Sequence, residues 1–427
     1  ENYSSRAVTS SLAMQICLTM PRRALSMPLV ATFAALSFMT IRLPKTTAFS
    51  SWSTVSPHRL ISSYGWHLTH TFHSSTSQYA TGEDHGEATE GSDPKRVVFL
   101  GTPPVAARSL ELLLDASKSG RGGGFEVSAV VTQPPARSGR KKRLTPSPVH
   151  QLAEAQGIPV LTPEKAKDED FLQALREDIN PDLCITAAYG QFLPTKFLNI
   201  PKFGTLNIHP SLLPLYRGAS PVQRSLQDGV AETGVSVLFT VLKMDAGPIV
   251  RQPRITLDGD EQTPDLLLRL FELGTKELVD ALPSVWSGEC IPIPQDETLA
   301  TKADKIDKSE GLLDFREGAE VCHNKVRGFA GWPGTWAPFS IGGKDPVNLK
   351  IKASKIISRA TNQPSSLSNN ASLNKDGVIE VQCDDGSIFG ICEIQAPNKN
   401  SQPSKVFWNG LRGEEMSWAT EELAKSK

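Results

Sequence analysis

Three side chains, Asn207, His209 and Asp245, have types and a spacing that suit acid–base chemistry. Asn207 and His209 lie at the end of a short apolar strand signal, and strand alternation places them on one side of it. Asp245 comes 36 residues after the histidine and follows an apolar, β-branched run, Val235–Leu242, which predicts a buried strand. A carboxamide, an imidazole and a carboxylate at strand ends can orient a nucleophile, move its proton and stabilise an oxyanion.

A lone histidine in such a setting is more often a buried core residue with a satisfied asparagine beside it. The surrounding sequence favours the chemical interpretation. Residues 207–223 read NIHPSLLPLYRGASPVQ and residues 244–250 read MDAGPIV. Together they resemble the signature of the 10-formyltetrahydrofolate-dependent formyltransferases, and the SLLPxxRGAxPxQ form is most similar to that of the methionyl-tRNA formyltransferases. The resemblance covers about residues 95–427.

This resemblance implies transfer of a formyl group from 10-formyltetrahydrofolate, as co-substrate, to the amino group of methionyl-initiator tRNA, with no metal. Asn207 would donate its NH2 group to the developing oxyanion, and His209 would carry the proton from the attacking amine to the leaving nitrogen. Asp245 would hold the tautomer of the imidazole and favour its charged form.

The resemblance also implies which residues bind the folate. The loop after His209 supplies Ser211, Leu212, Leu213 and Pro214. The segment AYGQFLP, residues 188–194, follows a predicted strand and is similar to the pterin-pocket segment of the family, which adds Tyr189, Gly190 and Phe192. Because ligands of open α/β sheets bind at the carboxyl ends of strands, this position suits a pocket. The two aromatic side chains could equally fill the core.

Residues 137–143, RSGRKKR, form a basic loop in which five of seven residues are basic. Its Gly, Ser and Pro context excludes a stable helix. A cationic loop gains affinity by releasing counterions from phosphates, although a solvated surface loop is the ordinary alternative. The loop resembles the family's tRNA-acceptor-binding insertion, with Arg140 at the position of its important arginine. The implied tRNA contacts are Arg137, Arg140, Lys141, Lys142 and Arg143, together with Lys350 and Lys352 further along the chain.

The elements that must position these residues open as β-α-β. Strands are predicted at 96–101, 125–132 and 183–188, and helices between the first two strands and at 150–157 and 170–179. This order predicts an α/β fold with a doubly wound, mainly parallel sheet. The first turn reads GTPP and not GxGxxG, so a dinucleotide site is rejected.

We expect four parts in a chain of 427 residues. Residues 1–93 are a targeting segment with an acidic linker and no fixed structure, 94–292 the formyltransferase domain, 293–314 a linker, and 315–427 a smaller domain. In the smaller domain a helix at 319–329 and strands at 347–353, 378–382 and 388–394 predict a small β-barrel, which the resemblance makes OB-like. Residues 408–410, WNG, are expected to close the barrel.

The composition of the chain limits its possible partners and its location in the cell. The net charge of −1 gives the chain no global field for nucleic acid, so RNA contact must be local. Six cysteines without a CxxC pair predict a reduced compartment, with no disulfide framework and no zinc or other metal site. Residues 2–82 contain no Asp or Glu but many Ser, Thr and basic residues, which is typical of an organellar transit segment. We expect a monomer without a membrane span in an organellar matrix, with the mitochondrion favoured over the plastid. A disordered N-terminal tail without a targeting signal is the alternative.

Two other functions stay open at this point. A formyltransferase could act on a sugar nucleotide or another small amine, but the basic loop is unexpected for a sugar nucleotide, and purine formyltransferases lack such a second domain. A non-catalytic folate- or RNA-binding protein has no reason to keep Asn207, His209 and Asp245 together.

Overall fold

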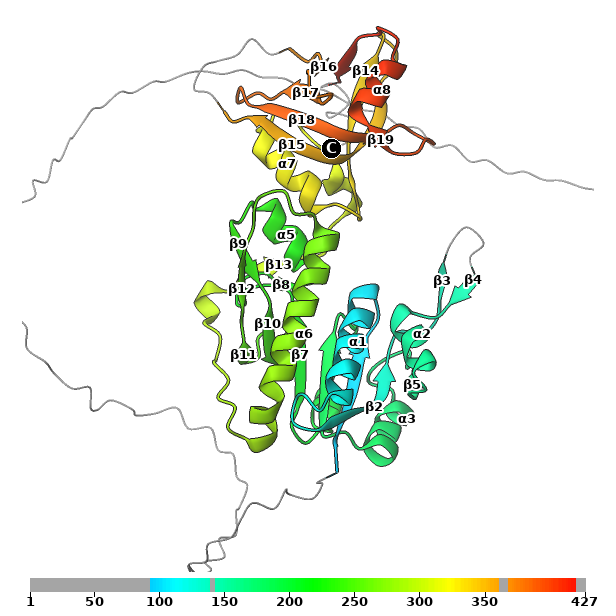
Figure 1. The fold of residues 1–427 in the computed structure, drawn as a ribbon, viewed down its shortest axis with the longest axis vertical. Helices are drawn as coiled ribbons and strands as arrows, with labels where there is room; N and C mark the ends of the chain where they lie inside the picture. Colours follow the sequence, from blue (N-terminus) through cyan, green and yellow to red (C-terminus); the bar gives the residue numbers. More distant parts are fainter. Residues whose placement is uncertain (1–92, 139–142, 361–367, 420–427) are drawn as a thin grey trace, which may run out of the picture. The chain divides into compact units, whose positions relative to one another are not determined.

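The computed structural model describes residues 93–138, 143–360 and 368–419 (Figure 1). The predicted targeting segment therefore lies outside the described residues except for Asp93, as do Arg140, Lys141 and Lys142 of the basic loop. Within the described ranges, no helix combines the length and the apolar character needed to cross a membrane.

A seven-stranded sheet forms the centre of the first folded part, in the order β11-β10-β7-β6-β1-β2-β5. The five strands from β7 to β5 are parallel, whereas β10 runs antiparallel to β7 and β11 antiparallel to β10. The strands are β1 (Lys95–Gly101), β2 (Phe125–Val131), β5 (Val160–Leu161), β6 (Leu183–Ala187), β7 (Thr205–His209), β10 (Ser236–Phe239) and β11 (Ile249–Arg251). The predicted mainly parallel sheet is thus confirmed.

Helices cover both faces of this sheet because its central strand is apolar on both sides. Val97 and Phe99 of β1 belong to one core cluster, and Val98 and Leu100 to another. The first cluster includes α1, α2, α5 and α6, and α1 and α6 lie side by side (Figure 1). The second includes α3 and α4. The helices are α1 (Pro104–Lys118), α2 (Pro148–Ala155), α3 (Glu169–Ala174), which continues as a π turn at Leu175–Ile179, α4 (Thr195–Leu198), α5 (Pro221–Gln227) and α6 (Thr263–Ser287).

Three two-stranded sheets are separate from this sheet. β3 (Ala136–Ser138) and β4 (Arg143–Thr145) form the stem of the basic loop, and β9 (Glu232–Gly234) pairs with β12 (Arg254–Thr256). β8 (Arg217–Gly218) pairs in parallel with β13 (Lys302–Ala303). The last pairing places part of the predicted linker directly against the loop that follows His209.

The second folded part is a nearly closed antiparallel sheet in the order β16-β17-β18-β15-β14-β20, with β19 beside β18. A bridge from Asn370, just before β16, to Ser417 of β20 joins the two ends of this order. Phe315, Phe389 and Trp418 meet in its core. The elements are α7 (Ala319–Gly328), β14 (Thr335–Ile341), β15 (Val347–Ser358), β16 (Ser372–Leu373), β17 (Ile379–Gln382), β18 (Ile388–Gln395), β19 (Gln402–Pro403), α8 (Ser404–Gly410) and β20 (Met416–Trp418). The predicted barrel-like second domain is confirmed.

Two sequence predictions were wrong in detail. The strand predicted at Val235–Leu242 ends at Phe239, where the chain enters the turn that returns to β11, and the Phe239 N–H donates to Pro248 O (3.0 Å) across this hairpin. Val241 and Leu242 consequently lie exposed in the turn. Residues 408–410 do not close the barrel either. They end helix α8, whose Phe407 is buried against the sheet, and β20 supplies the closing strand.

Candidate active site

The structure brings Asn207, His209 and Asp245 together. Asn207 and His209 lie on β7 opposite Leu238 and Ser236 of β10, and the turn after β10 carries Asp245. Asp245 Oδ1 lies 3.6 Å from His209 Nδ1, and both side chains are largely buried. Asp245 Oδ2 accepts a 2.9 Å hydrogen bond from the Gly218 N–H. The carboxylate is therefore fixed at both oxygens, toward the imidazole on one side and the backbone on the other.

The other imidazole nitrogen has a partner that the sequence did not reveal. His209 Nε2 lies 3.0 Å from the backbone oxygen of Tyr216. A carbonyl oxygen can only accept, so Nε2 carries a proton in this arrangement. The Tyr216 carbonyl thus sets the tautomer, the role that the sequence had given to Asp245. When the ring is also protonated at Nδ1, that N–H faces the Asp245 carboxylate, which stabilises the positive charge.

Asn207 presents its NH2 group to the site. The Thr186 hydroxyl of β6 donates to Asn207 Oδ1 at 2.8 Å, which fixes the orientation of the amide. Among the described residues the NH2 group has no hydrogen-bond acceptor, and the side chain is only half-buried. A donor held in place without a protein acceptor is what stabilisation of an oxyanion requires.

The predicted folate loop is folded tightly onto the site. The Ser211 hydroxyl donates to Leu215 O (2.7 Å), so it is used within the loop. The Leu213 N–H donates to the buried Ser236 hydroxyl (3.1 Å), and Gln252 Nε2 donates to Leu213 O (2.8 Å). Ser211 and Leu213 are buried, and Leu212 and Pro214 half-buried. Ser236 and Gln252 were not predicted, because neither lies in the recognisable motif.

The segment after β6 is held by the ends of two other strands. Tyr189 O accepts hydrogen bonds from the Thr102 hydroxyl (3.0 Å) and Gln133 Nε2 (3.3 Å). The Tyr189 side chain packs in the second core cluster, and burial, with a smaller contribution from Asp168, raises its pKa to about 12. Gly190 (φ 85°) is exposed, and Phe192 is 62% exposed. In the structure Tyr189 is a core side chain, whereas Phe192 is free to meet a ligand.

The predicted tRNA contacts lie on other elements. Arg137 and Arg143 are exposed on the β3–β4 stem, and Lys350 and Lys352 lie on β15, exposed and half-buried. No hydrogen bond or ion pair within residues 93–138, 143–360 and 368–419 joins any of the four to the Asn207–His209–Asp245 group. These four side chains therefore take no direct part in holding that group.

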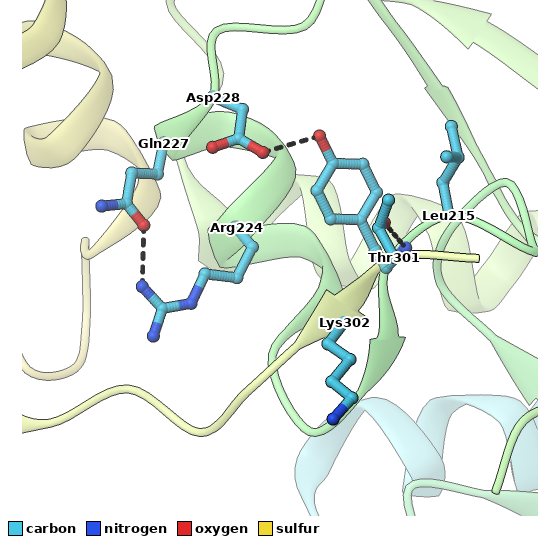
Figure 2. Close-up of a pocket in the computed structure, with 7 residues that line it drawn as sticks. Leu215, Arg224, Gln227, Asp228, Thr301 and Lys302 are labelled. Carbon is cyan, nitrogen blue, oxygen red and sulfur yellow. Dashed lines mark hydrogen bonds between the residues drawn. The ribbon is translucent and has the colours of Figure 1, made fainter. Parts of the chain in front are cut away.

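A cavity of about 410 Å³ is lined in part by Tyr216. Figure 2 shows Arg224, Asp228 and Thr301 around it. Its lining is mostly polar, and the Tyr216 hydroxyl donates to Asp228 Oδ2 at 2.9 Å. Burial, followed by this hydrogen bond, raises the pKa of Tyr216. The lining residues are Leu215, Tyr216, Arg224, Gln227, Asp228, Thr301 and Lys302. None of the predicted folate contacts is among them. No cluster of His, Cys, Asp and Glu suited to a metal occurs in the part of the chain that the structure describes.

Gly247 lets the Asp245 turn close on β10. A Cβ atom at Gly247 would lie 1.7 Å from the backbone oxygen of Phe239, which cannot move without distorting the hairpin. We therefore expect Gly247→Ala to lower the free energy of unfolding by about 1–3 kcal/mol and to reduce kcat, because the turn carries Asp245. Chemical denaturation and steady-state kinetics would measure both. Gly410→Ala is the matched control, since a Cβ atom there would have no heavy atom within 4 Å apart from its chain neighbours and its own helix. A Gly247→Ala variant with unchanged stability and kcat would contradict the need for this close approach.

Comparison with known proteins identifies the relatives of this chain. The formyl transferase family model matches residues 95–282, and the model of the formyl transferase C-terminal domain matches residues 305–412. The methionyl-tRNA formyltransferase of Enterococcus faecalis is 36% identical over 316 residues, covering 74% of this chain and 96% of the relative. That of Bacillus subtilis is 35% identical over 320 residues, with 75% and 96% covered.

A solved sugar 3N-formyl transferase shares the fold at 17% identity, with a TM-score of 0.51, covering 73% of this chain and all of that one. Identity this low supports the fold alone. The relatives from E. faecalis and B. subtilis are matched over nearly their whole length, across both folded parts. The chain belongs to the methionyl-tRNA formyltransferase family.

Proposed function

We propose that this protein transfers the formyl group of 10-formyltetrahydrofolate to the amino group of methionyl-initiator tRNA. The observation that carries the proposal is the meeting of the Asn207 NH2 group, which has no acceptor among the residues that the structure describes, with the His209–Asp245 pair at adjacent strand ends. The names of relatives that are 35–36% identical give the acceptor. A rival sugar-nucleotide activity has only a fold-level likeness in its favour.

The chemistry follows from these groups. The amine of the methionyl ester attacks the formyl carbon, a C–N bond forms, and negative charge develops on the formyl oxygen. The Asn207 NH2 group donates to that oxygen. The tetrahedral intermediate collapses by breaking the bond to the folate nitrogen, which must gain the proton lost by the amine. His209 takes up this proton at Nδ1, because Nε2 already donates its own proton to Tyr216 O, and Asp245 then faces the new N–H.

Single-turnover assays with a panel of amines would test the acceptor. The full chain, loaded with 10-formyltetrahydrofolate, would be mixed with methionyl-tRNA, an amino-sugar nucleotide or glycinamide ribonucleotide. We expect rapid formylation of the tRNA alone. Transfer to a small amine with no reaction of the tRNA would overturn the assignment of the acceptor and leave only the folate half of the proposal.

The basic loop at residues 137–143 is proposed to bind the acceptor arm of the tRNA. Arg140→Ala should raise the Kd for tRNA and reduce the slope of log K against log salt by about 0.7–0.9, the value for one lost phosphate contact. The rate at saturating tRNA should not change. Titrations at several salt concentrations would measure this, with Arg176→Ala as a control that removes the same charge from an exposed site on the π turn. Equal weakening by both variants would mean a solvated loop without a specific role.

We further propose an organellar site of action, with the mitochondrion favoured over the plastid. Support comes from the acid-free, hydroxyl-rich composition of residues 2–82. Residues 1–93, placed behind an initiator methionine and fused to a fluorescent protein, should direct it to mitochondria. Fluorescence in plastids would instead support the plastid as the site of action. Diffuse cytosolic fluorescence would show that this segment carries no targeting signal.

A further inference from the structure

Gln295 connects the segment between the two matched domains to the active site. It lies outside both family models, which cover residues 95–282 and 305–412. Its side-chain Nε2 donates to the backbone oxygens of Asp245 (2.8 Å) and Gly247 (2.7 Å). Both hydrogens of the amide are thus used on the turn that carries the catalytic carboxylate.

Arg217 fixes the orientation of that amide. Gln295 Oε1 accepts from Arg217 Nε (3.1 Å) and Nη2 (2.7 Å). Only one orientation of the amide satisfies these contacts, because the guanidinium can only donate and the two backbone oxygens can only accept. The Arg217 side chain is only 9% exposed, so its guanidinium has little freedom to turn away.

Glu297 in turn fixes Arg217. Its carboxylate accepts from Arg217 Nη1 and Nη2, both at 3.0 Å, and also from Lys243. The hydrogen bonds from Arg217, followed by those from Lys243, lower the pKa of Glu297 to about 2. Because the pKa of Glu297 is lowered in the folded protein, its carboxylate stays ionised at any pH above the usual carboxyl pKa. The ion pair with Arg217 is lost only as the pH falls toward about 2. Glu297 and Arg217 are therefore both charged at neutral pH.

A series of hydrogen bonds thus runs from Glu297 through Arg217 and Gln295 to the backbone of Asp245. Gly218, the residue after Arg217, donates its N–H to the Asp245 carboxylate. Asp245 itself has φ of 50°, a left-handed conformation that a non-glycine residue adopts only when its surroundings hold it there. We infer that Gln295 is a positioning residue for formyl transfer, which holds the Asp245 turn so that its carboxylate faces His209. This inference rests on the function proposed above only in taking Asp245 as part of the reacting group.

Gln295→Glu is the most informative variant. The carboxylate keeps the contact with Arg217 but places an oxygen against the Asp245 and Gly247 carbonyls, which also accept. We expect kcat to fall about 10- to 100-fold, the effect of moving a catalytic group by roughly 1 Å, with KM for both substrates nearly unchanged. Gln295→Met should give a similar loss, because it keeps the length but has no donor. Gln156→Glu is the control: its amide oxygen also accepts from a cation, Lys118, but it lies on the surface after α2. It should leave kcat unchanged.

A double-mutant cycle with Asp245→Asn separates positioning from general damage. If Gln295 acts only by placing the carboxylate, Gln295→Glu should lower kcat by no more than about 2-fold in the Asp245→Asn variant, which lacks that carboxylate. Thermal unfolding of each variant would show whether the fold survives. The inference would be overturned if the two losses of kcat multiplied in the double variant. It would also be overturned if Gln295→Glu alone kept kcat within 2-fold of the wild type. If the wild type formylates an amine other than methionyl-tRNA, the same cycle can be run with that amine, so failure of the proposed acceptor remains distinguishable.

Discussion

Asn207→Ala should lower kcat for formyl transfer about 10²- to 10³-fold, with little change in the affinity for 10-formyltetrahydrofolate or tRNA. The reason is geometric. The Asn207 oxygen is bound by the Thr186 hydroxyl at 2.8 Å, so its NH2 group is directed outward in a fixed orientation. A donor of this kind strengthens its hydrogen bond as charge develops on the formyl oxygen, and it contributes mainly in the transition state.

Single-turnover rates at saturating concentrations of both substrates would measure this loss directly, and equilibrium titration with each substrate would measure binding. Asn199→Ala is the control, because Asn199 is exposed at the end of α4. A variant of Asn207 with nearly normal kcat and a raised KM would contradict the oxyanion role, since uniform binding raises KM without changing the chemical step.

His209→Ala should reduce kcat by about 10²- to 10⁴-fold, the usual range for loss of a general acid–base group. The same change removes the partner of the buried Asp245 carboxylate, 3.6 Å away, and the donor to Tyr216 O. We therefore also expect lower stability, which thermal unfolding would reveal. Asp245→Asn should lower kcat less than His209→Ala does, because the imidazole remains bound to Tyr216 O.

If His209 and Asp245 act as one unit, the variant that carries both changes should be no slower than His209→Ala alone. Full multiplication of the two losses would instead mean that they contribute to separate steps. His150→Gln serves as a control for histidine loss, because its ring contacts Glu154 on the same surface helix, α2. This control should retain the wild-type rate.

The order of the predicted elements and the local chemistry were evident in the sequence. The β-α-β opening could be predicted because strand and helix periodicities are local, and alternation in β7 places Asn207 and His209 on one side. The barrel-like second domain followed from turn-separated strands and the resemblance. The exact end of the strand before Asp245 was not predictable. The run to Leu242 is interrupted only by Ser236 and Thr240, but the hairpin return to β11 ends the strand at Phe239.

Tertiary structure alone decided how the proposed catalytic group is held. The partner of His209 Nε2 is the Tyr216 backbone oxygen, and main-chain acceptors leave no mark on residue type. Gln295 lies 50 residues after the Asp245 turn that it binds, in a polar stretch that composition marks as a linker. Sequence determines which side chains can carry out formyl transfer, because their chemistry is intrinsic. Their positions depend on contacts between distant segments, which exist only once the chain has folded.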